Sequence, residues 1–243
     1  MNHQKLFYVL ILFAGTLLFG SCNEDDMDMS NTATLTEADA VAVVEGALAN
    51  DAGGVTGDME DALSVAYEYT AKSVNPCGVP QDSSITKTVN RPNFTASYST
   101  DWSWTLNCTN NILPVSLDFA RTAEGSYTAR RLQTTDAVES AWLVDDLGTS
   151  PNWTINGTHN RMGDHQSLVG QQHTFTSDAD FTFASIAVRK DDFALLSGSG
   201  TFTVALGETG GGSRTWEGSI TFLGDGAASI VLNGETYLID LDQ

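Results

Sequence analysis

The stretch FTASYSTDWSWTLNC, residues 94–108, alternates between apolar and polar side chains over its whole length. Its odd positions are all polar, and its even positions are apolar except for Thr100. Successive side chains of an extended chain point to opposite sides, so this pattern predicts a long β-strand with one buried face and one wet face. Such strands are typical of antiparallel sheets, and Cys108 falls on the predicted buried face.

The same period of two returns along the chain toward its C-terminal end. A predicted turn at Asn110-Asn111 starts the next such segment, and Asp225-Gly226 and Asn233-Gly234 signal tight hairpin turns, because these residues accept positive φ. The last strands leave no room for a crossover helix between them. Residues 76–243 are therefore predicted to form an antiparallel meander sheet or a partly closed β-barrel. The alternating apolar residues of the later segments include Val115, Leu117, Phe119, Phe181, Phe183, Phe202, Val204 and Leu206.

Residues 35–75 predict two short helices joined by a glycine-rich loop. Thr36 and Asp39 resemble a capping box at the start of the first helix, and Asp58 is expected to cap the second. The second helix should end before Pro76, because the residue before a proline disfavours helical geometry. Both helices carry apolar stripes that need a partner surface. We therefore expect a mainly β fold with a small N-terminal helical part, in which a two-helix hairpin covers one face or opening of the sheet.

The N-terminal residues have the pattern of a secretory signal peptide. A short start with one lysine is followed by an uncharged apolar run, Leu6 to Gly20, and then by small residues. The run is shorter than the roughly 20 residues that a membrane-spanning helix needs. Residues 1–21 are therefore predicted to be a signal peptide rather than a buried helix.

The segment Leu17-Leu18-Phe19-Gly20-Ser21-Cys22 resembles the lipobox of bacterial lipoproteins, with Phe19 where that family usually has leucine. The resemblance implies that the Cys22 sulfur receives a diacylglycerol, that the leader is cut before Cys22, and that the new amino terminus is acylated too. Two or more acyl chains anchor a protein stably, because each buried CH₂ contributes about 0.8 kcal/mol. The expected partner of this chain is therefore a membrane, reached through acyl chains on Cys22.

Residues 22–34 are predicted to form a flexible tether, because Glu24, Asp25, Asp26 and Asp28 repel one another. Acids directly after the cysteine also resemble the export signal of Bacteroidota-type surface lipoproteins, which implies an outer-membrane, surface-exposed location. The C-terminal stretch GSITFLGDGAASIVLNGETYLIDL, residues 218–241, is loosely similar to the last hairpins of uncharacterised lipoproteins of that group. That similarity brings no catalytic residue with it.

The charge of the chain limits its possible partners, and its cysteines indicate its compartment. The formal charge is −20, and −21 without residues 1–21, which argues against nucleic acid as a partner. If Cys22 is lipidated, Cys77 and Cys108 are left as a pair. In an oxidising compartment the simplest prediction for such a pair is a disulfide, with two free thiols as the alternative.

Motifs with a known mechanism are missing from the sequence, which has no G-x-S-x-G, H-E-x-x-H, G-x-x-x-x-G-K or G-x-G-x-x-G. His159, His165 and His173, with Asp164, lie within 15 residues and offer imidazoles for a transition metal. The alternative, which we favour, is that they are loop histidines between strands. No cofactor and no catalytic residue are predicted.

Two further groups of residues are weak candidates for binding. Trp102 and Trp104, with Tyr98, could form a platform for sugar rings, although their position on the apolar face favours a core role. Trp142 and Trp153 lie near predicted turns and are better candidates for exposed rings. The acid pairs that could hold calcium, or that are simply solvated turn residues, are Asp145-Asp146 and Asp191-Asp192.

The sequence thus favours a lipid-anchored envelope lipoprotein that acts as a non-catalytic binding or structural module, for a glycan or another envelope component. One alternative is a barrel-like carrier of an apolar ligand, whose cavity the even face of residues 94–106 would line. The other alternative is a hydrolase without a recognisable motif. These functions need different sites. A glycan-binding module needs exposed aromatic rings, a carrier needs an internal cavity, and a hydrolase needs histidines or paired acids that converge in a cleft.

Overall fold

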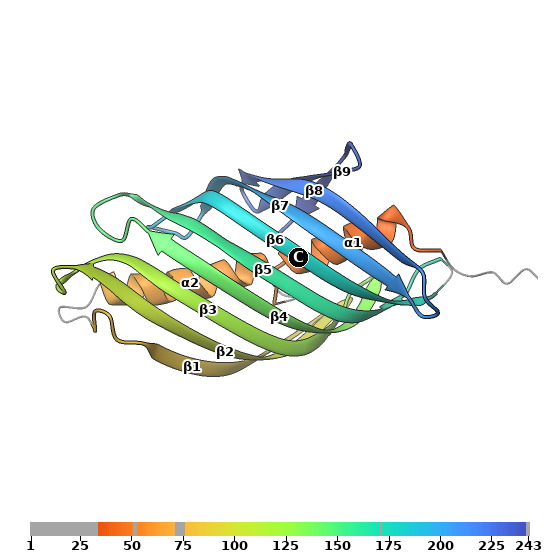
Figure 1. Cartoon of the computed structure of the whole chain (residues 1–243), viewed down its shortest axis with the longest axis horizontal. Coiled ribbons are helices and arrows are strands. Elements are labelled where there is room, and N and C mark those ends of the chain that lie inside the picture. The colour runs from red at the N-terminus through yellow and green to blue at the C-terminus, as the bar shows by residue number, and fades with distance from the viewer. Residues whose placement is uncertain (1–33, 51–52, 71–75, 171, 242–243) are drawn as a thin grey trace, which may run out of the picture. The chain divides into compact units, whose positions relative to one another are not determined.

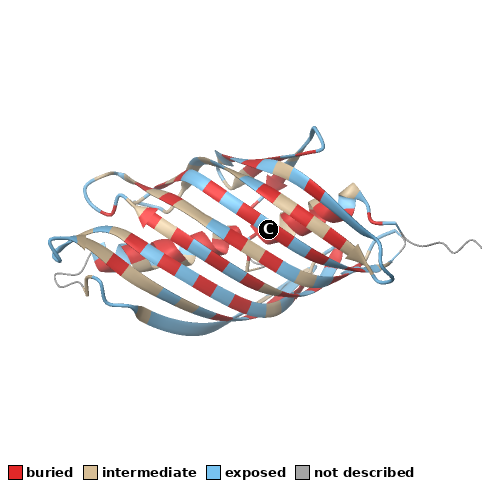
Figure 2. Cartoon of the chain, in the orientation of Figure 1, coloured by how far each residue is buried: buried red, intermediate tan, exposed pale blue. Residues whose placement is uncertain are grey.

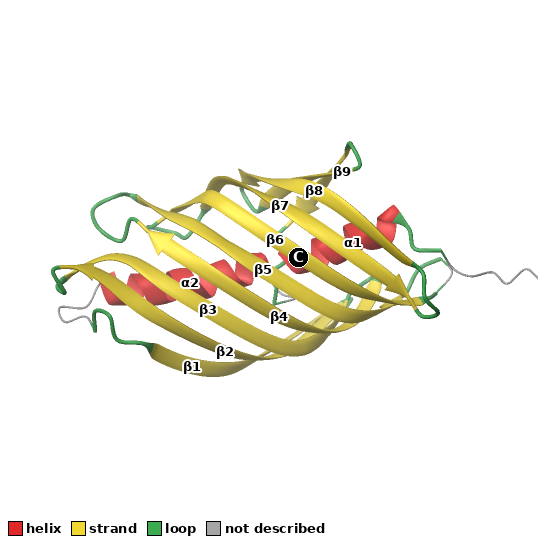
Figure 3. Cartoon of the chain, viewed as in Figure 1, coloured by secondary structure: helices red, strands yellow, loops and turns green. Residues whose placement is uncertain are grey.

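The computed structural model describes residues 34–50, 53–70, 76–170 and 172–241, which belong to one compact unit. The predicted signal peptide, Cys22 and most of the predicted tether lie outside these residues. Two helices, α1 (Glu37–Leu48) and α2 (Val55–Thr70), precede ten strands (Figure 1; Figure 3). The strands are β1 (Gln81–Arg91), β2 (Phe94–Thr109), β3 (Leu113–Thr128), β4 (Leu132–Asp145), β5 (Asn152–Ser167), β6 (Thr174–Arg189), β7 (Leu195–Glu208), β8 (Ser213–Gly224), β9 (Ala227–Leu232) and β10 (Glu235–Asp240).

All ten strands form one antiparallel meander sheet in the order of the sequence. The predicted turns are confirmed: Asn110 and Asn111 have positive φ, as do both residues of Asp225-Gly226 and of Asn233-Gly234. Within the described residues β1 and β10 do not pair, so the sheet stays open. The prediction of a mainly β meander with N-terminal helices is therefore confirmed.

The sheet has an inner face toward the helices and an outer face toward solvent. Strand β2 shows the expected alternation: Tyr98 and Leu106 are buried on the inner side, while the odd residues between them are exposed or half-buried. Figure 2 shows this alternation as stripes of buried and exposed residues along the neighbouring strands. The inner face supplies most of the core, together with the apolar sides of both helices. Its large buried side chains include Trp142, Trp153, Phe175, Phe181, Phe183, Phe202, Trp216 and Phe222.

The two helices lie one after the other along the inner face of the sheet (Figure 1). Helix α1 contacts β6 and β7, whereas α2 contacts β3 and β4, so each helix covers its own pair of strands. The capping box of α1 is confirmed: Thr36 Oγ1 accepts from the Asp39 amide at 3.2 Å, and Asp39 Oδ2 accepts from the Thr36 amide at 2.9 Å.

The start of α2 differs from the prediction. The helix begins at Val55, so Asp58 lies inside its first turn and does not cap it. The Asp58 side chain is fully buried and faces the sheet, where it is needed as an ion-pair partner. A helix-capping acid and an acid that forms a buried ion pair with the sheet look alike in sequence, because both are acids near the start of a helix.

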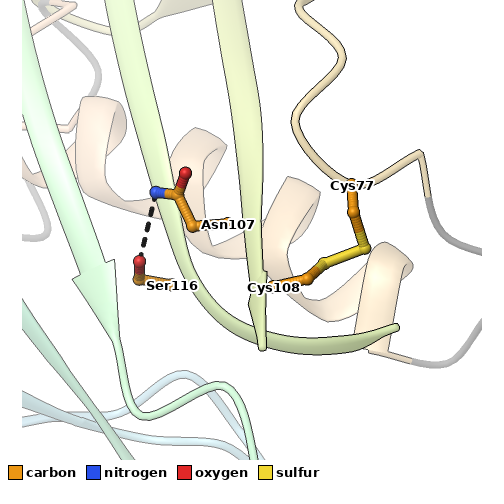
Figure 4. The surroundings of a disulfide bond; sticks show 4 residues. All are labelled: Cys77, Asn107, Cys108 and Ser116. Atoms are coloured by element: carbon orange, nitrogen blue, oxygen red, sulfur yellow. Dashed lines mark hydrogen bonds between the residues drawn. A yellow bond between two sulfur atoms is a disulfide. The ribbon is translucent and has the colours of Figure 1, made fainter. Parts of the chain in front are cut away.

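A disulfide joins Cys77 to Cys108, as predicted, with 5.7 Å between the two Cα atoms (Figure 4). It ties the segment before β1 to the end of β2, where the Gly78 amide also donates to the Leu106 carbonyl at 2.8 Å. Strand β1 is an edge strand and is mostly exposed. Its Lys87 points toward the helices and pairs with Asp61 of α2 at 2.7 Å. No helix among the described residues is both long enough and apolar enough to cross a membrane.

Candidate functional site

The most polar part of the interior is a group of side chains around Asp58. Strand register places Arg121 of β3, Ser140 of β4 and His159 of β5 side by side on the inner face, directly under α2. Asp58 Oδ1 pairs with Arg121, Ser140 Oγ donates to Asp58 Oδ2 at 2.8 Å, and His159 Nδ1 lies 3.0 Å from Asp58 Oδ2. Arg121 also donates to Thr100 Oγ1 at 3.3 Å. We call these five residues the Asp58 cluster.

The Asp58 cluster contains the residue types of a hydrolase but not their arrangement. A nucleophilic serine needs a hydrogen bond to the imidazole that takes its proton. Here Ser140 and His159 both contact the same carboxylate oxygen, and the described residues show no Ser140–His159 hydrogen bond. The side chains of Asp58 and His159 are also fully buried. The arrangement fastens α2 to the sheet and leaves a substrate no access to these groups.

A second buried ion pair lies beneath α1. Asp136 Oδ2 accepts from Arg161 Nε at 2.8 Å and from Nη2 at 2.5 Å, and Arg161 donates to the Gly46 carbonyl of α1 at 2.7 Å. Burial acts to lower the pKa of Arg161, but Asp136 outweighs it and the pKa is raised. Burial raises the pKa of Tyr98, whose hydroxyl accepts from Arg161 at 2.8 Å. This pair fixes α1 as the Asp58 cluster fixes α2.

The structure does not bring the three candidate histidines together. His159 and His165 lie on β5, so the expectation of loop histidines is wrong for both; six residues of extended strand separate them, which is roughly 20 Å. His165 lies 2.9 Å from Thr134 Oγ1 and 2.6 Å from Ser177 Oγ, while His173 Nε2 lies 3.6 Å from Asp39. Asp164 points to the outer face and is exposed. The described residues include no group of three metal-binding side chains.

The expectation of exposed rings at Trp142 and Trp153 is wrong. These side chains are 3% and 1% exposed, and they pack against Phe183 at 5.6 Å and Phe193 at 5.4 Å between ring centroids. Both tryptophans occupy strand positions whose side chains point to the inner face. This orientation, and not their closeness to turns, decides that they are buried. Trp102 and Trp104 also lie on the inner face, half-buried against the core, with Tyr98 fully buried beside them, so their core role is confirmed.

The acidic turns serve their own loops. Asp192 accepts two hydrogen bonds from Arg189, at 2.9 and 2.7 Å, which together with the Ala194 amide lower the pKa of Asp192 to about 2. Asp146 has a positive φ of 65° and accepts from Thr154 Oγ1 at 2.7 Å. These contacts agree with the interpretation of turn acids, and the described residues offer no calcium-binding group at either pair.

The outer face of the sheet carries a shallow trough of about 700 Å³ across the middle of β1 to β6. Its floor is a register row of small side chains, and acids and amides stand on both sides. The side chains of the floor are Ser103, Ala120, Ala141, Thr158 and Thr182. The trough is an open surface, and the rings of Trp102 and Trp104 pack against the core on the other side of the sheet.

A more enclosed space lies at the end of the sheet where β1 turns into β2 and β3 turns into β4. This cleft measures about 610 Å³. Arg91, Arg130 and Arg131 line it together with Glu45 and Asp240, so we call it the arginine cleft. Its remaining wall is apolar and is made by Ala42, Ala49, Phe94, Tyr127, Ala129 and Leu132. No local sequence signal indicates the arginine cleft, because Arg91 and the pair Arg130-Arg131 come to one space only through the register of the strands.

No protein-family model, no curated protein and no solved structure matches this chain.

Proposed function

We propose that this chain is a lipid-anchored, non-catalytic binding module of the bacterial cell envelope, held to a membrane by acyl chains on Cys22. The Cys77–Cys108 disulfide is the observation that carries the proposal, because such bonds persist in oxidising compartments outside the cytosol. Of the three cysteines in the sequence, it leaves Cys22, the last residue of the lipobox-like segment, for lipidation.

The interior supports a module that binds rather than catalyses. Each titratable group in the Asp58 cluster and in the Asp136–Arg161 pair is used to hold a helix on the sheet. A carrier would use the even face of β2 to line its cavity. This face packs instead against the helices, where the ring centroids of Tyr69 of α2 and Trp104 lie 6.3 Å apart. Accessible polar surface is found on the outer face and in the arginine cleft. A ligand is therefore expected to bind from outside.

The anchor is tested by growing bacteria that express the full chain with an alkyne-tagged fatty acid. We expect label on the wild-type protein in the membrane fraction, and loss of both label and membrane association in Cys22→Ser. The matched control is the double variant Cys77→Ser/Cys108→Ser, which removes the other cysteines and should keep the label. An unlabelled wild-type chain that stays in the soluble fraction would contradict the proposal.

The side of the membrane is a separate question with its own test. Added protease should digest the protein on intact cells if the module is displayed at the surface. Replacing Glu24, Asp25 and Asp26 by asparagine or glutamine should then protect it, because the export signal that these acids resemble would be lost. Equal digestion of both proteins would show that the acids act only as a tether.

A further inference from the structure

Two adjacent arginines stand apart from the other described cations of this acidic chain. Arg121, Arg161 and Arg189 each pair with an aspartate, and so does Lys87. Lys190 donates to two carbonyl oxygens, and the Arg214 guanidinium lies 4.8 Å from the Trp216 ring. The side chains of Arg130 and Arg131 make no hydrogen bond or ion pair with any described residue.

Two arginines without a partner among the described residues are unexpected in a chain that contains 31 acidic and 11 basic residues. Arg130 and Arg131 lie in the tight turn between β3 and β4, which is closed by the Ala129 amide donating to the Leu132 carbonyl at 2.8 Å. Both residues line the arginine cleft, together with Arg91 at the end of β1. The three arginines therefore line one space of about 610 Å³, which lies within the range of small-molecule sites.

The floor of the arginine cleft is aromatic and firmly supported. Phe94 stacks on Tyr127 with 6.2 Å between ring centroids and 23° between planes. The buried Arg161 guanidinium lies 5.1 Å from the Tyr127 ring and holds it from below. Helix α1 approaches so closely that a Cβ at Gly46 would lie 2.3 Å from the Tyr127 hydroxyl. The floor is thus a fixed apolar surface beside three positive charges.

We propose that the arginine cleft binds a phosphate ester, with the phosphate on Arg91, Arg130 and Arg131 and the organic part on Phe94. Guanidinium groups bind phosphate oxygens through paired, charge-assisted hydrogen bonds. Arg130 and Arg131 together already offer more donors than the two oxygens of one carboxylate can use, whereas a phosphate has further oxygens.

The ester has two sources, a soluble metabolite or a lipid headgroup. The described chain starts at the same end of the sheet, where the Leu35 amide donates to Glu208 Oε1 beside the β7–β8 turn at 3.2 Å. From Leu35 back to Cys22 the chain has 13 residues, a reach of at most about 45 Å when extended. If Cys22 is acylated, the arginine cleft is within reach of headgroups, but phosphate binding itself does not depend on the anchor.

The test titrates the full chain, in a non-ionic detergent without phosphate, with glycerol 3-phosphate and separately with water-soluble dibutyryl phosphatidylglycerol. Calorimetry should show binding to the wild type, and the double variant R130Q/R131Q should bind about tenfold or more weakly, because each charged hydrogen bond contributes substantially. The matched control R189Q/R214Q removes two exposed arginines elsewhere and should bind like the wild type. Circular dichroism should show that all variants are folded.

Each outcome decides the proposal. Binding of glycerol 3-phosphate that R130Q/R131Q weakens supports it and shows that a soluble ester suffices. Binding of the dibutyryl lipid alone, lost in R130Q/R131Q, supports it with a lipid headgroup as the source. Failure of both probes in the millimolar range, or equal binding by R130Q/R131Q, overturns it. Phosphate binding without acylation of Cys22 would overturn the anchor alone.

Discussion

Asp58 of α2 and His159 of β5 meet across the interface between helix and sheet, with 3.0 Å between Asp58 Oδ2 and His159 Nδ1, although 101 residues separate them in sequence. Arg121 and Ser140 reach the same carboxylate from two further strands. One buried acid thus links three strands to a helix. Its neighbours can stay charged or polar in the interior only while it is present.

Replacing Asp58 by asparagine should therefore destabilise the fold strongly. The change leaves the buried Arg121 without its counter-charge, and breaking a buried ion pair costs roughly 3–5 kcal/mol. Urea denaturation followed by circular dichroism measures the difference. The control Asp192→Asn makes the same chemical change in an ion pair whose side chains are 46% and 52% exposed, and should leave the midpoint almost unchanged. Equal midpoints for all three proteins would contradict the role given to Asp58.

His165 should make stability depend on pH in the acid range. Burial, with a smaller effect of Arg161, lowers its pKa to about 3 from an ordinary value of 6.5. The folded state keeps His165 neutral between these values while the unfolded state binds a proton, so stability is lost as pH falls from about 6.5 toward 3. The slope from this residue is at most about 1.4 kcal/mol per pH unit. His165→Gln should flatten the curve in this window; an unchanged slope would argue against a neutral buried imidazole.

Removing the disulfide should loosen β1 first. Closing a loop of this length contributes on the order of 3 kcal/mol in the chain-entropy model, so Cys77→Ser/Cys108→Ser should lower the free energy of unfolding by about that amount. Hydrogen exchange should rise mainly in β1, which has a strand partner on one side only. Cys22→Ser is the matched control and should leave both measurements unchanged.

Gly125 of β3 lies under the ring of Tyr98 and cannot carry a side chain. A Cβ there would lie 2.2 Å from the Ser97 carbonyl oxygen and 2.5 Å from Tyr98 Cδ1. Gly125→Ala should cost about 1–3 kcal/mol, because the sheet backbone must shift. Gly148→Ala, where nothing lies within 4 Å, should stay within about 0.5 kcal/mol of the wild type. Thermal unfolding of the two variants compares them directly.

The sequence predicts the strands well because their signals are local. The alternation of residues 94–108, the glycine-containing turns and the Thr36 capping box each depend on a few neighbouring residues, and the structure contains all of them. The burial of Trp142 could also be predicted from the sequence. Val138 and Val144 lie an even number of positions away from it, so their side chains point to the same face, and they are buried with it. The closeness of Trp142 to a turn does not decide its exposure.

The polar contacts of the interior could not be predicted from such local signals. Asp58 has the appearance of a helix cap, whereas the counter-charge for its burial comes from Arg121, 63 residues away. His159 and Arg161 alternate with exposed residues like apolar side chains, yet their polarity suggests a loop or a surface. The arginine cleft likewise joins turns that are about 40 residues apart. Such contacts are set by the register of the whole sheet.

The position of Lys87 has a consequence for how copies of this chain meet one another. An exposed strand edge is a template on which a foreign strand can grow, and such growth ends in fibrils. An inward-pointing charge is one of the devices that oppose this, and Lys87 is held in that orientation by Asp61. The open sheet therefore carries a guard against aggregation at its longest free border.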